Sequence, residues 1–405
     1  MNKGDLITEV ATVVGKKKVA EEASNSVLAV AKKKGKVLGL KIALAAIISV
    51  LNFSTLAVAA SAPIANEWEK TVAAAKHEGK VVVLGPQGNE TRDALVEGFQ
   101  RKYPEIKVEH SGITSASLPP KLLAEQKAKR YSVDLLVQGT GSVVSGLLSV
   151  KAITPIKPFM VGPNTADPSV WLNKKFSFSD DAGQYIIAMS VYIMPPFAYN
   201  TTMISAKEIT SWKDLLLPKW KGKLASRDPR VSGGGLANAT FWYASPKLGK
   251  DFIQKLFGSQ EIALSRDDRQ LLDFVGQRKY PLAIGPSQVL AKEWQDKGVP
   301  LQQYNPEALR EGAVTTAGNG TISVPLNPPH PNALKVYIDY LLSKQGQTEW
   351  SKAIGFASLR QDTPRDHVEE QLIPKEGVQY FDSNSERHIN MRNEVVEYLN
   401  TIIGR

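Results

Sequence analysis

The residues best suited to bind a ligand lie in a turn near the middle of the chain. Residues 232–235 (Ser-Gly-Gly-Gly) follow an expected strand at 223–226 and lead into an expected helix from about residue 236. This arrangement leaves several backbone N–H groups free at one place, and such groups bind anions. Arg227 and Arg230 precede the turn, and a guanidinium holds a carboxylate or phosphate through paired hydrogen bonds. Two alternatives remain open: a connection without a ligand, and Arg230 in a surface ion pair.

Small polar loops also follow other expected strands, at 80–84, 133–137 and 282–284. Their glycine, hydroxyl and amide groups offer hydrogen-bond donors, and in open α/β sheets ligands bind outside the carboxyl ends of the strands. A tyrosine near residue 200 could pack on an organic part of the ligand. The predicted ligand-binding residues are Gln87, Asn89, Thr140, Ser142, Tyr199, Arg230, Ser232, Gly233, Gly234, Ser287 and Gln288.

Motifs for catalysis or metal binding do not emerge from the sequence. The chain has five histidines, none paired at a metal-ligand spacing, and no cysteine. It has neither a G-x-S-x-G elbow nor a G-x-x-x-x-G-K-[ST] phosphate loop. We therefore predict that the protein is not an enzyme and has no cofactor, metal or catalytic residue. A hydrolase would need a nucleophile–base pair.

The pattern of expected elements predicts an α/β fold. A strand at 80–84, a helix at 91–103 and a strand at 106–110 form a β-α-β opening, which favours a parallel sheet covered by helices. A chain of 405 residues is long enough for two domains with full cores. The segment 321–325 (TISVP) is expected to return as a strand to the first domain, and a helix is expected at 386–403.

Several motifs in sequence order resemble one protein family. They are SWKDLLLPKWKGKLA at 211–225 followed by Asp-Pro and Ser-Gly, Tyr-Asn-Thr at 199–201 after an apolar run, and PHPNALK at 329–335 continued by YLLSKQGQ at 340–347. Together they resemble the periplasmic solute-binding proteins of ABC importers, and most closely the branch that contains the ferric-iron binders. The resemblance covers roughly residue 66 to the C-terminus.

This resemblance implies a two-lobed periplasmic binding protein of the type II-like class. Each lobe would be a mixed, mostly parallel sheet covered by helices, joined by hinge strands. The expected division is 60–196 plus 305–350 for lobe 1, and 197–304 plus 351–405 for lobe 2. The implied partners are a small-molecule solute and an ABC permease in the inner membrane, with no nucleic acid bound by the mature protein, which would be a monomer.

The iron ligands of the resembling branch have no counterpart at the matching positions. Its adjacent tyrosines align with Ser287 and Gln288, its histidine with residues 87–89, and its acidic ligand with Gly139 and Thr140. Hard ferric iron prefers phenolate, carboxylate and imidazole ligands. The preferred solute is therefore a small organic or inorganic anion, with a ferric chelate second and a cation such as a polyamine or thiamine third. A periplasmic sensor for a membrane receptor is the rival from another class.

The N-terminal residues predict an export route. Residues 1–30 resemble the start of HU-type histone-like proteins without their sheet or DNA-embracing arms, so 1–36 is interpreted as an adventitious extension and DNA binding as a weak alternative. Lysines followed by an apolar run and Ala-Val-Ala predict an export signal at 37–59, cleaved after Ala59, with an uncleaved anchor as the competing interpretation. The formal net charge of +10 divides evenly between this leader and the rest, so the body is only mildly basic.

Overall fold

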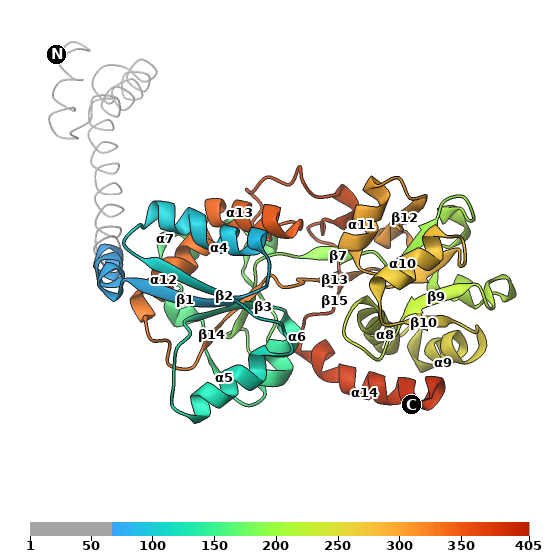
Figure 1. Cartoon of the computed structure of the whole chain (residues 1–405), viewed down its shortest axis with the longest axis horizontal. Helices are drawn as coiled ribbons and strands as arrows, with labels where there is room; N and C mark the ends of the chain where they lie inside the picture. Colours follow the sequence, from blue (N-terminus) through green and yellow to red (C-terminus); the bar gives the residue numbers. More distant parts are fainter. Residues whose placement is uncertain (1–66, 405) are drawn as a thin grey trace, which may run out of the picture. The chain divides into compact units, whose positions relative to one another are not determined.

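The computed structural model describes residues 67–404 (Figure 1). The chain divides into two units, residues 1–70 and 71–405, and the account below concerns the second. The expected HU-like segment and export signal lie outside the described residues. Within the described part, no helix is both long and apolar enough to cross a membrane.

The first lobe is built on a mixed sheet with the strand order β2-β1-β3-β14-β6-β5, and β4 also pairs with β14. The first three strands are parallel, whereas β14 is antiparallel to both of its neighbours. The late strand therefore lies in the middle of the sheet, which confirms the expected return. The strands are β1 (Lys80–Gly85), β2 (Lys107–Gly112), β3 (Leu135–Gln138), β4 (Ile153–Thr154), β5 (Ser177–Phe178), β6 (Ile186–Ala188) and β14 (Thr321–Pro325).

Helices connect and cover these strands. Buried Asp134 ties one of them, α12, to the sheet: its carboxylate accepts hydrogen bonds from the Val82 amide (2.8 Å) and from both the amide and Nδ1 of His330 (2.8 Å each). The proline-flanked histidine is thus part of a structural contact. The helices are α4 (Asn89–Lys102), α5 (Leu118–Lys127), α6 (Thr140–Val143), continued by a π-helical turn η1 (Val144–Leu148), α7 (Pro163–Ala166), α12 (Pro331–Leu341) and α13 (Lys344–Ile354).

The second lobe has its own sheet, with the order β10-β9-β11-β8-β12. β9, β10 and β11 are parallel to one another, and β8 is antiparallel to both β11 and β12. The strands are β8 (Phe197–Asn200), β9 (Leu224–Arg227), β10 (Ala263–Ser265), β11 (Leu282–Ile284) and β12 (Leu301–Gln303), and the helices are α8 (Gly234–Ala244), α9 (Gly249–Ser259), α10 (Asp268–Gly276) and α11 (Gln288–Asp296).

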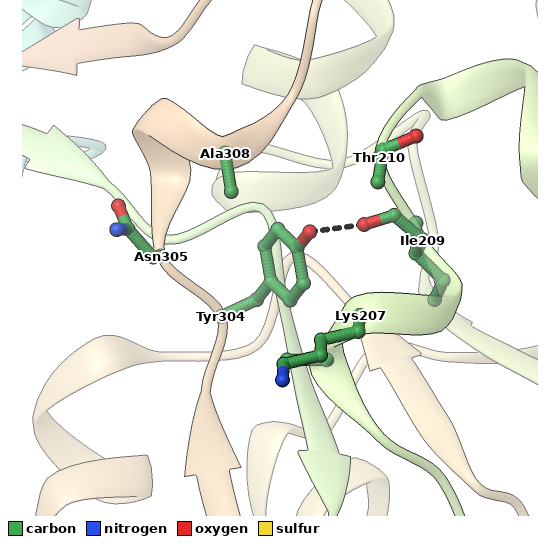
Figure 2. Close-up of a pocket in the computed structure, with 7 residues that line it drawn as sticks. Lys207, Ile209, Thr210, Tyr304, Asn305 and Ala308 are labelled. Carbon is green, nitrogen blue, oxygen red and sulfur yellow. Dashed lines mark hydrogen bonds between the residues drawn. The ribbon is translucent and has the colours of Figure 1, made fainter.

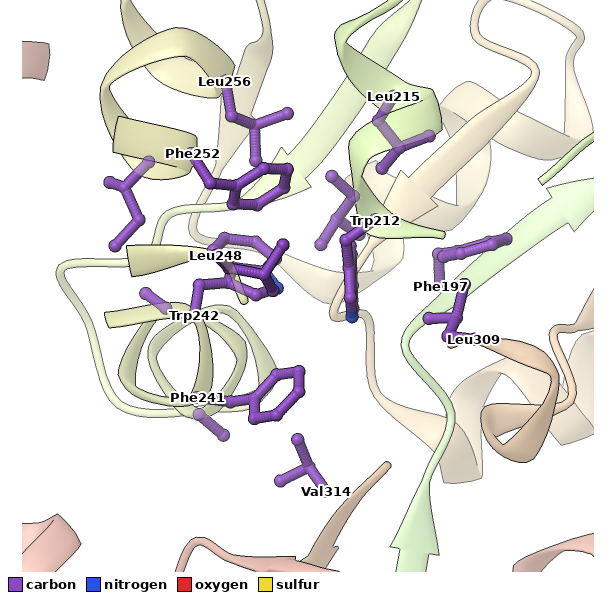
Figure 3. Close-up of a cluster of buried hydrophobic side chains, with 14 of the residues drawn as sticks. Phe197, Trp212, Leu215, Phe241, Trp242, Leu248, Phe252, Leu256, Leu309 and Val314 are labelled. Carbon is purple, nitrogen blue, oxygen red and sulfur yellow. The ribbon is translucent and has the colours of Figure 1, made fainter. Parts of the chain in front are cut away.

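An aromatic core holds the second lobe together (Figure 3). Trp212 and Trp242 meet edge to face at 4.8 Å, and both are almost fully buried. Trp212 begins a 3₁₀ turn, η6 (Trp212–Leu216), whose N-cap is Ser211 in a reciprocal capping box with Asp214. The conspicuous tryptophan motif is therefore structural, because its serine starts a turn that delivers Trp212 to the core.

A third, smaller sheet and one long helix join the lobes. β7 (Tyr192–Met194), β13 (Val314–Thr316) and β15 (Phe381–Asp382) form a three-stranded sheet between the two larger ones (Figure 1). Helix α14 (Glu386–Ile403) belongs to both lobes, because Ile389 packs in a first-lobe core whereas Val395 and Leu399 pack in the second-lobe core. The two-lobed α/β fold is confirmed.

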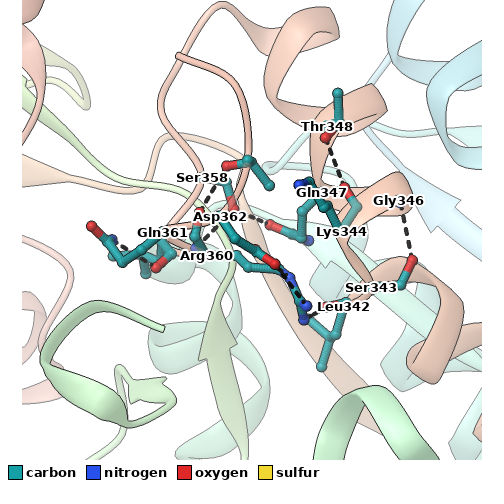
Figure 4. Close-up of polar contacts among 12 residues, drawn as sticks. Leu342, Ser343, Lys344, Gly346, Gln347, Thr348, Ser358, Arg360, Gln361 and Asp362 are labelled. Carbon is teal, nitrogen blue, oxygen red and sulfur yellow. Dashed lines mark hydrogen bonds and ion pairs between the residues drawn. The ribbon is translucent and has the colours of Figure 1, made fainter. Parts of the chain in front are cut away.

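The segment that follows α13 pairs with residues of the first lobe. Ser358 and Arg360, which the expected division places in lobe 2, form β-bridges with Ser190 and Trp171. Polar contacts fix it there (Figure 4). Arg360 donates to both Asp362 carboxylate oxygens (2.8 and 3.2 Å) and to the Leu342 carbonyl (3.1 Å). The sequence alone did not indicate that Asp362 and the Leu342 carbonyl are the partners of Arg360.

Candidate functional site

The carboxyl ends of β1, β2 and β3 gather polar residues at one edge of the first-lobe sheet. A Cβ atom built on Gly112 would lie 3.1 Å from Cγ of the predicted Gln87. One built on Gly139 would lie 3.3 Å from Oδ1 of Asn319 and 3.8 Å from Oγ of Ser115. Gln87 thus lies at the end of β2, whereas Asn319 and Ser115, which the sequence analysis missed, lie at the end of β3; all three are exposed.

Two helices begin at this edge without a side-chain cap. Asn89 is the first residue of α4, whose N-cap is Gly88, and Thr140 is the first residue of α6, whose N-cap is Gly139. Thr140 is only 1% exposed, and its Oγ1 has no hydrogen-bond partner among the described residues. Ser142 differs, because its hydroxyl donates to the Gly139 carbonyl at 3.0 Å. Of the two predicted hydroxyls at this edge, only that of Thr140 lacks a hydrogen-bond partner among the described residues.

In the second lobe, the glycine turn opens α8 as predicted. Gly233 adopts φ 137°, a conformation that favours glycine, and no side chain caps the helix. The first backbone hydrogen bond of the helix runs from the Ala237 amide to the Gly233 carbonyl (3.1 Å). The amides at the start of a helix have no acceptor within the helix, and Ser232 and Gly233 are exposed. This is the geometry that binds anions at helix N-termini.

A second helix start lies beside this turn. A Cβ atom on Gly285 would be 2.7 Å from the Gly235 amide nitrogen, so the loop after β11 packs directly on the start of α8. Ser287 is the N-cap of α11 and accepts a hydrogen bond from the Leu290 amide (3.4 Å). The Oε1 of Gln288 is buried without a partner among the described residues. The structure therefore brings the predicted Ser287 and Gln288 next to the glycine turn.

The arginine nearest this junction is Arg227. Its Nη1 lies 2.5 Å from Oδ2 of Asp268, and the two side chains are 17% and 22% exposed. The other oxygen of Asp268 accepts a hydrogen bond from the Ser287 amide at 3.1 Å. A Cβ atom on Gly233 would be 2.6 Å from the Arg227 Nε, which is buried without a partner among the described residues. Arg227 thus lies directly against the anion-accepting turn.

Arg230, the arginine preferred from the sequence, is engaged elsewhere. Its Nε and Nη2 donate to the Asp228 carboxylate (2.9 and 3.0 Å), and its Nη1 donates to the Gly404 carbonyl (2.6 Å). Arg266 also donates to Asp228, at 3.0 Å. Burial acts to raise the pKa of Asp228, but the hydrogen bonds from Arg230 and Arg266 outweigh burial and hold the pKa at about 2. Arg230 is the ion-paired residue that the sequence analysis left open as an alternative.

Tyr199 lies away from the other predicted site residues. It pairs with Leu282 at the start of β11, whereas the site residues follow the end of that strand. Its hydroxyl donates to Oε1 of Gln302 at 3.0 Å, and burial raises the pKa of Tyr199. The structure does not bring it to the strand ends, because β8 runs antiparallel to β11.

Ser351 and His367 come together without forming a usable nucleophile. Oγ of Ser351 lies 2.9 Å from Nε2 of His367 and donates to the Phe356 carbonyl at 2.5 Å. Ser351 is fully buried in α13. Its hydroxyl therefore joins the helix end to the following loop, out of reach of a substrate.

Cavities lie elsewhere in the described residues. One of about 310 Å³ is bordered by Ile209, Thr210, Tyr304 and Ala308, and the Tyr304 hydroxyl donates to the Ile209 carbonyl across it (Figure 2). Another, of about 180 Å³, lies between the first-lobe sheet and the small joining sheet. Neither includes the predicted site residues. In the described part of the chain, no three His, Cys, Asp or Glu side chains are grouped to hold a metal ion.

The chain has two lobes, each with its own sheet, strands that join the lobes, and polar residues at the strand ends. This architecture is that of a periplasmic binding protein. The family model of the bacterial extracellular solute-binding proteins matches residues 85–348, and the chain belongs to that family. It is thus the substrate-binding component of an ABC transporter, a class of proteins found outside the cytoplasmic membrane. No curated protein sequence matches the chain.

Solved structures with the same fold have low sequence identity to the chain. AfuA from Actinobacillus pleuropneumoniae, with fructose-6-phosphate bound, is 20% identical over 80% of this chain and 98% of its own, with a TM-score of 0.58. Trichodesmium FutA in complex with iron and citrate is 16% identical over 80% and 99%, with a TM-score of 0.61. Iron-bound HitA from Pseudomonas aeruginosa is 15% identical over 80% and 99%, with a TM-score of 0.57. At these identities the likeness concerns the fold.

Proposed function

We propose that this protein captures a small anion, such as a carboxylate or phosphonate, between its two lobes and delivers it to an ABC permease. The second lobe would hold the anion at the start of α8, beside Arg227. The first lobe would close over it with Gln87, Asn89 and Thr140. Binding and release are hinge motions without covalent chemistry.

The observation that carries this proposal is the start of α8. Its amides are not capped by a side chain, its glycines let the chain turn tightly, and a guanidinium lies against it. Helix N-termini and guanidinium groups both favour anionic oxygens. Two neighbouring helices of the same lobe, α10 and α11, are capped by Asp267 and Ser287, whereas α8, like α9, has no side-chain cap.

Asp268 makes the site selective. Its carboxylate already occupies one Nη of Arg227, so an incoming anion meets a cation that is partly neutralised. A ligand with one compact anionic group would fit beside the pair, because Arg227 lies against the turn and its Nη2 is held there only by a long hydrogen bond to the Ser232 carbonyl (3.5 Å). An anion that also carried charge toward Asp268 would be repelled.

The test is a thermal-shift panel on the purified protein with phosphate, phosphonates, organic acids, ferric citrate, thiamine and spermidine. A ligand at a hundredfold excess over its dissociation constant stabilises the fold by about 2.7 kcal/mol. The variant Arg227→Gln should weaken binding of that ligand by roughly 10- to 150-fold, because hydrogen bonds to charged groups contribute about 1.5–3 kcal/mol. Arg278→Gln, an exposed arginine at the end of α10, is the matched control. A shift only with thiamine or spermidine would overturn the anion proposal.

A ferric chelate is the second candidate. The similar FutA structure contains iron together with citrate, and a chelate presents carboxylate oxygens to protein donors. The same panel separates the two candidates. If ferric citrate shifts the melting temperature and citrate alone does not, the chelate is the solute; if iron without a chelator shifts it, the protein has metal ligands that neither proposal includes.

Transport and sensing require the same closing protein, so sensing by a membrane receptor remains the rival role. Uptake of the labelled solute distinguishes them. Cells that lack this protein should lose uptake if it serves a permease, and should keep it if it serves only a receptor.

A further inference from the structure

We infer that Arg392, on the C-terminal helix α14, is a second anion-binding residue and belongs to the first-lobe half of the site. This inference rests on the proposed function and adds a residue that no sequence motif indicates. The ligand group it would take is an oxyanion, a carboxylate or a phosphate.

The first observation is that Arg392 lacks an acidic partner. Its Nη2 donates to the Ser383 carbonyl at 2.8 Å, and its Nε is buried without a partner. Among the described residues, no carboxylate oxygen lies within ion-pair distance of its guanidinium, in contrast to Arg227, Arg230 and Arg360. Burial lowers the pKa of Arg392, and the charge of Asp382 only partly opposes this. A cation taken out of water without an anionic partner destabilises the fold, so its retention calls for a partner that binds later.

The second observation is where the free end of this side chain lies. A Cβ atom on Gly141 would be 3.0 Å from Nη1 of Arg392, so the guanidinium rests against α6. Thr140, whose buried Oγ1 also lacks a partner among the described residues, is the neighbouring residue. Figure 1 shows α6 beside the first half of α14. Nη1 of Arg392 therefore lies against the residue that follows Thr140, at the strand end that Asn319 and Ser115 also approach.

The third observation concerns access. Arg392 is only partly buried, and Gly139 and Gly141 on either side of Thr140 are also partly exposed. Solvent therefore reaches the edge of this group, and a small anion can follow the same path. Among the described residues, Nη1 has no hydrogen-bond acceptor to displace, so binding would add hydrogen bonds rather than exchange them.

Removal of the Arg392 charge should leave the ligand-free protein at least as stable, but should weaken its binding of anions. Arg392→Met keeps the length of the side chain but removes the unpaired cation, so the ligand-free protein should melt at the same or a higher temperature. The thermal shift produced by inorganic phosphate or citrate should fall, with binding weakened at least tenfold. An arginine with a purely structural role would instead lower the melting temperature of the ligand-free protein, because its hydrogen bond to Ser383 is lost.

The experiment measures melting temperature and calorimetric affinity for phosphate and for citrate in four proteins: the unaltered chain, Arg392→Met, Arg392→Lys and the control Arg387→Met. Arg387 is exposed on the same helix and has no ion pair among the described residues. Arg392→Lys should restore part of the affinity, because it keeps the charge but not the planar fork.

The outcomes separate the two proposals. If the anion binds the unaltered chain and weakens with Arg227→Gln but not with Arg392→Met, this inference is wrong and the proposed function stands. If neither phosphate nor citrate binds the unaltered chain, the inference is overturned, and the proposed function then depends on the rest of the panel. If Arg387→Met and Arg392→Met weaken anion binding equally, the effect comes from the overall charge of α14 rather than from Arg392 itself. The inference would then also be overturned.

Discussion

At the scale of single residues, the arginines show how partners decide function. Arg227 and Arg230 are three positions apart in the sequence and look equivalent there. In the structure, Arg230 binds Asp228 and the C-terminal Gly404, whereas Arg227 lies against the glycine turn. The sequence could place a guanidinium near the site but could not show which one lies against the turn, because Asp268 and Gly404 reach the two arginines from distant parts of the chain.

Asp228 supports a prediction about pH. Its pKa is about 2 when folded, below the usual value of 3.8, so its ionised form favours the folded state. This stabilisation is present above about pH 4 and is lost as the pH falls through 2. Asp228→Asn should lower the unfolding free energy at pH 7 by about 2 kcal/mol, measured by urea denaturation.

The difference between Asp228→Asn and the unaltered chain should shrink as the pH approaches 2. Asp251→Asn, in an exposed pair with Lys255, is the control and should change little. A constant difference between pH 7 and pH 2.5 would mean that packing, rather than the ion pairs, holds Asp228 in place.

At the scale of elements, the glycines at the start of α8 hold two loops together. The sequence predicted this turn and its helix, because a Ser-Gly-Gly-Gly run after an apolar strand is a local pattern. It did not reveal that Gly285 packs on the same turn, since that contact joins positions about fifty residues apart. Asn319, within an Ala-Gly-Asn-Gly turn, was missed for the same reason: β14 brings it to the end of β3.

Gly234→Ala tests this contact. A Cβ atom there would lie 2.6 Å from the Gly285 carbonyl oxygen, so the two loops would have to separate. We expect a loss of about 1–3 kcal/mol in stability, as for other overpacked sites, together with weaker binding of the solute. The readouts are thermal melting and calorimetry.

Gly258→Ala in α9 is the matched control. Its Cβ would meet the flexible end of Gln254 at 3.2 Å and make an ordinary contact with Cγ2 of Ile402 at 3.6 Å. This variant should be neutral or stabilised by about 0.5–1 kcal/mol, because alanine favours a helix interior. If both variants behave alike, the close approach of Gly234 and Gly285 has no particular importance.

At the scale of the whole molecule, three connections and α14 link two separately packed lobes. The family motifs predicted two lobes correctly, because strand and helix patterns are local. The β-bridges of the segment after α13 to Trp171 and Ser190 were not predicted, because they have no local signal in the sequence. The long reach of α14 into both cores was missed for the same reason, although its limits were predicted.

Closure around the solute should be visible in solution. Small-angle scattering should give a smaller radius of gyration when the anion identified by thermal shift is saturating, because contacts made only in the closed state shift the population toward it. At the same anion concentration, the Arg227→Gln variant should keep the radius of gyration of the ligand-free protein. An unchanged radius with calorimetrically proven binding would mean that the solute binds to one lobe alone.

Helix α14 packs in the cores of both lobes, and this affects when the chain can fold during its synthesis. The first-lobe core lacks Ile389, and the second lacks Val395 and Leu399, until the last helix has left the ribosome. Strand β14, which fills the centre of the first sheet, also comes late. Contacts between distant positions form slowly, so a growing chain stays unfinished until its end is made. In an exported protein, such a delay would leave the polypeptide unfolded while it is threaded through a translocation channel.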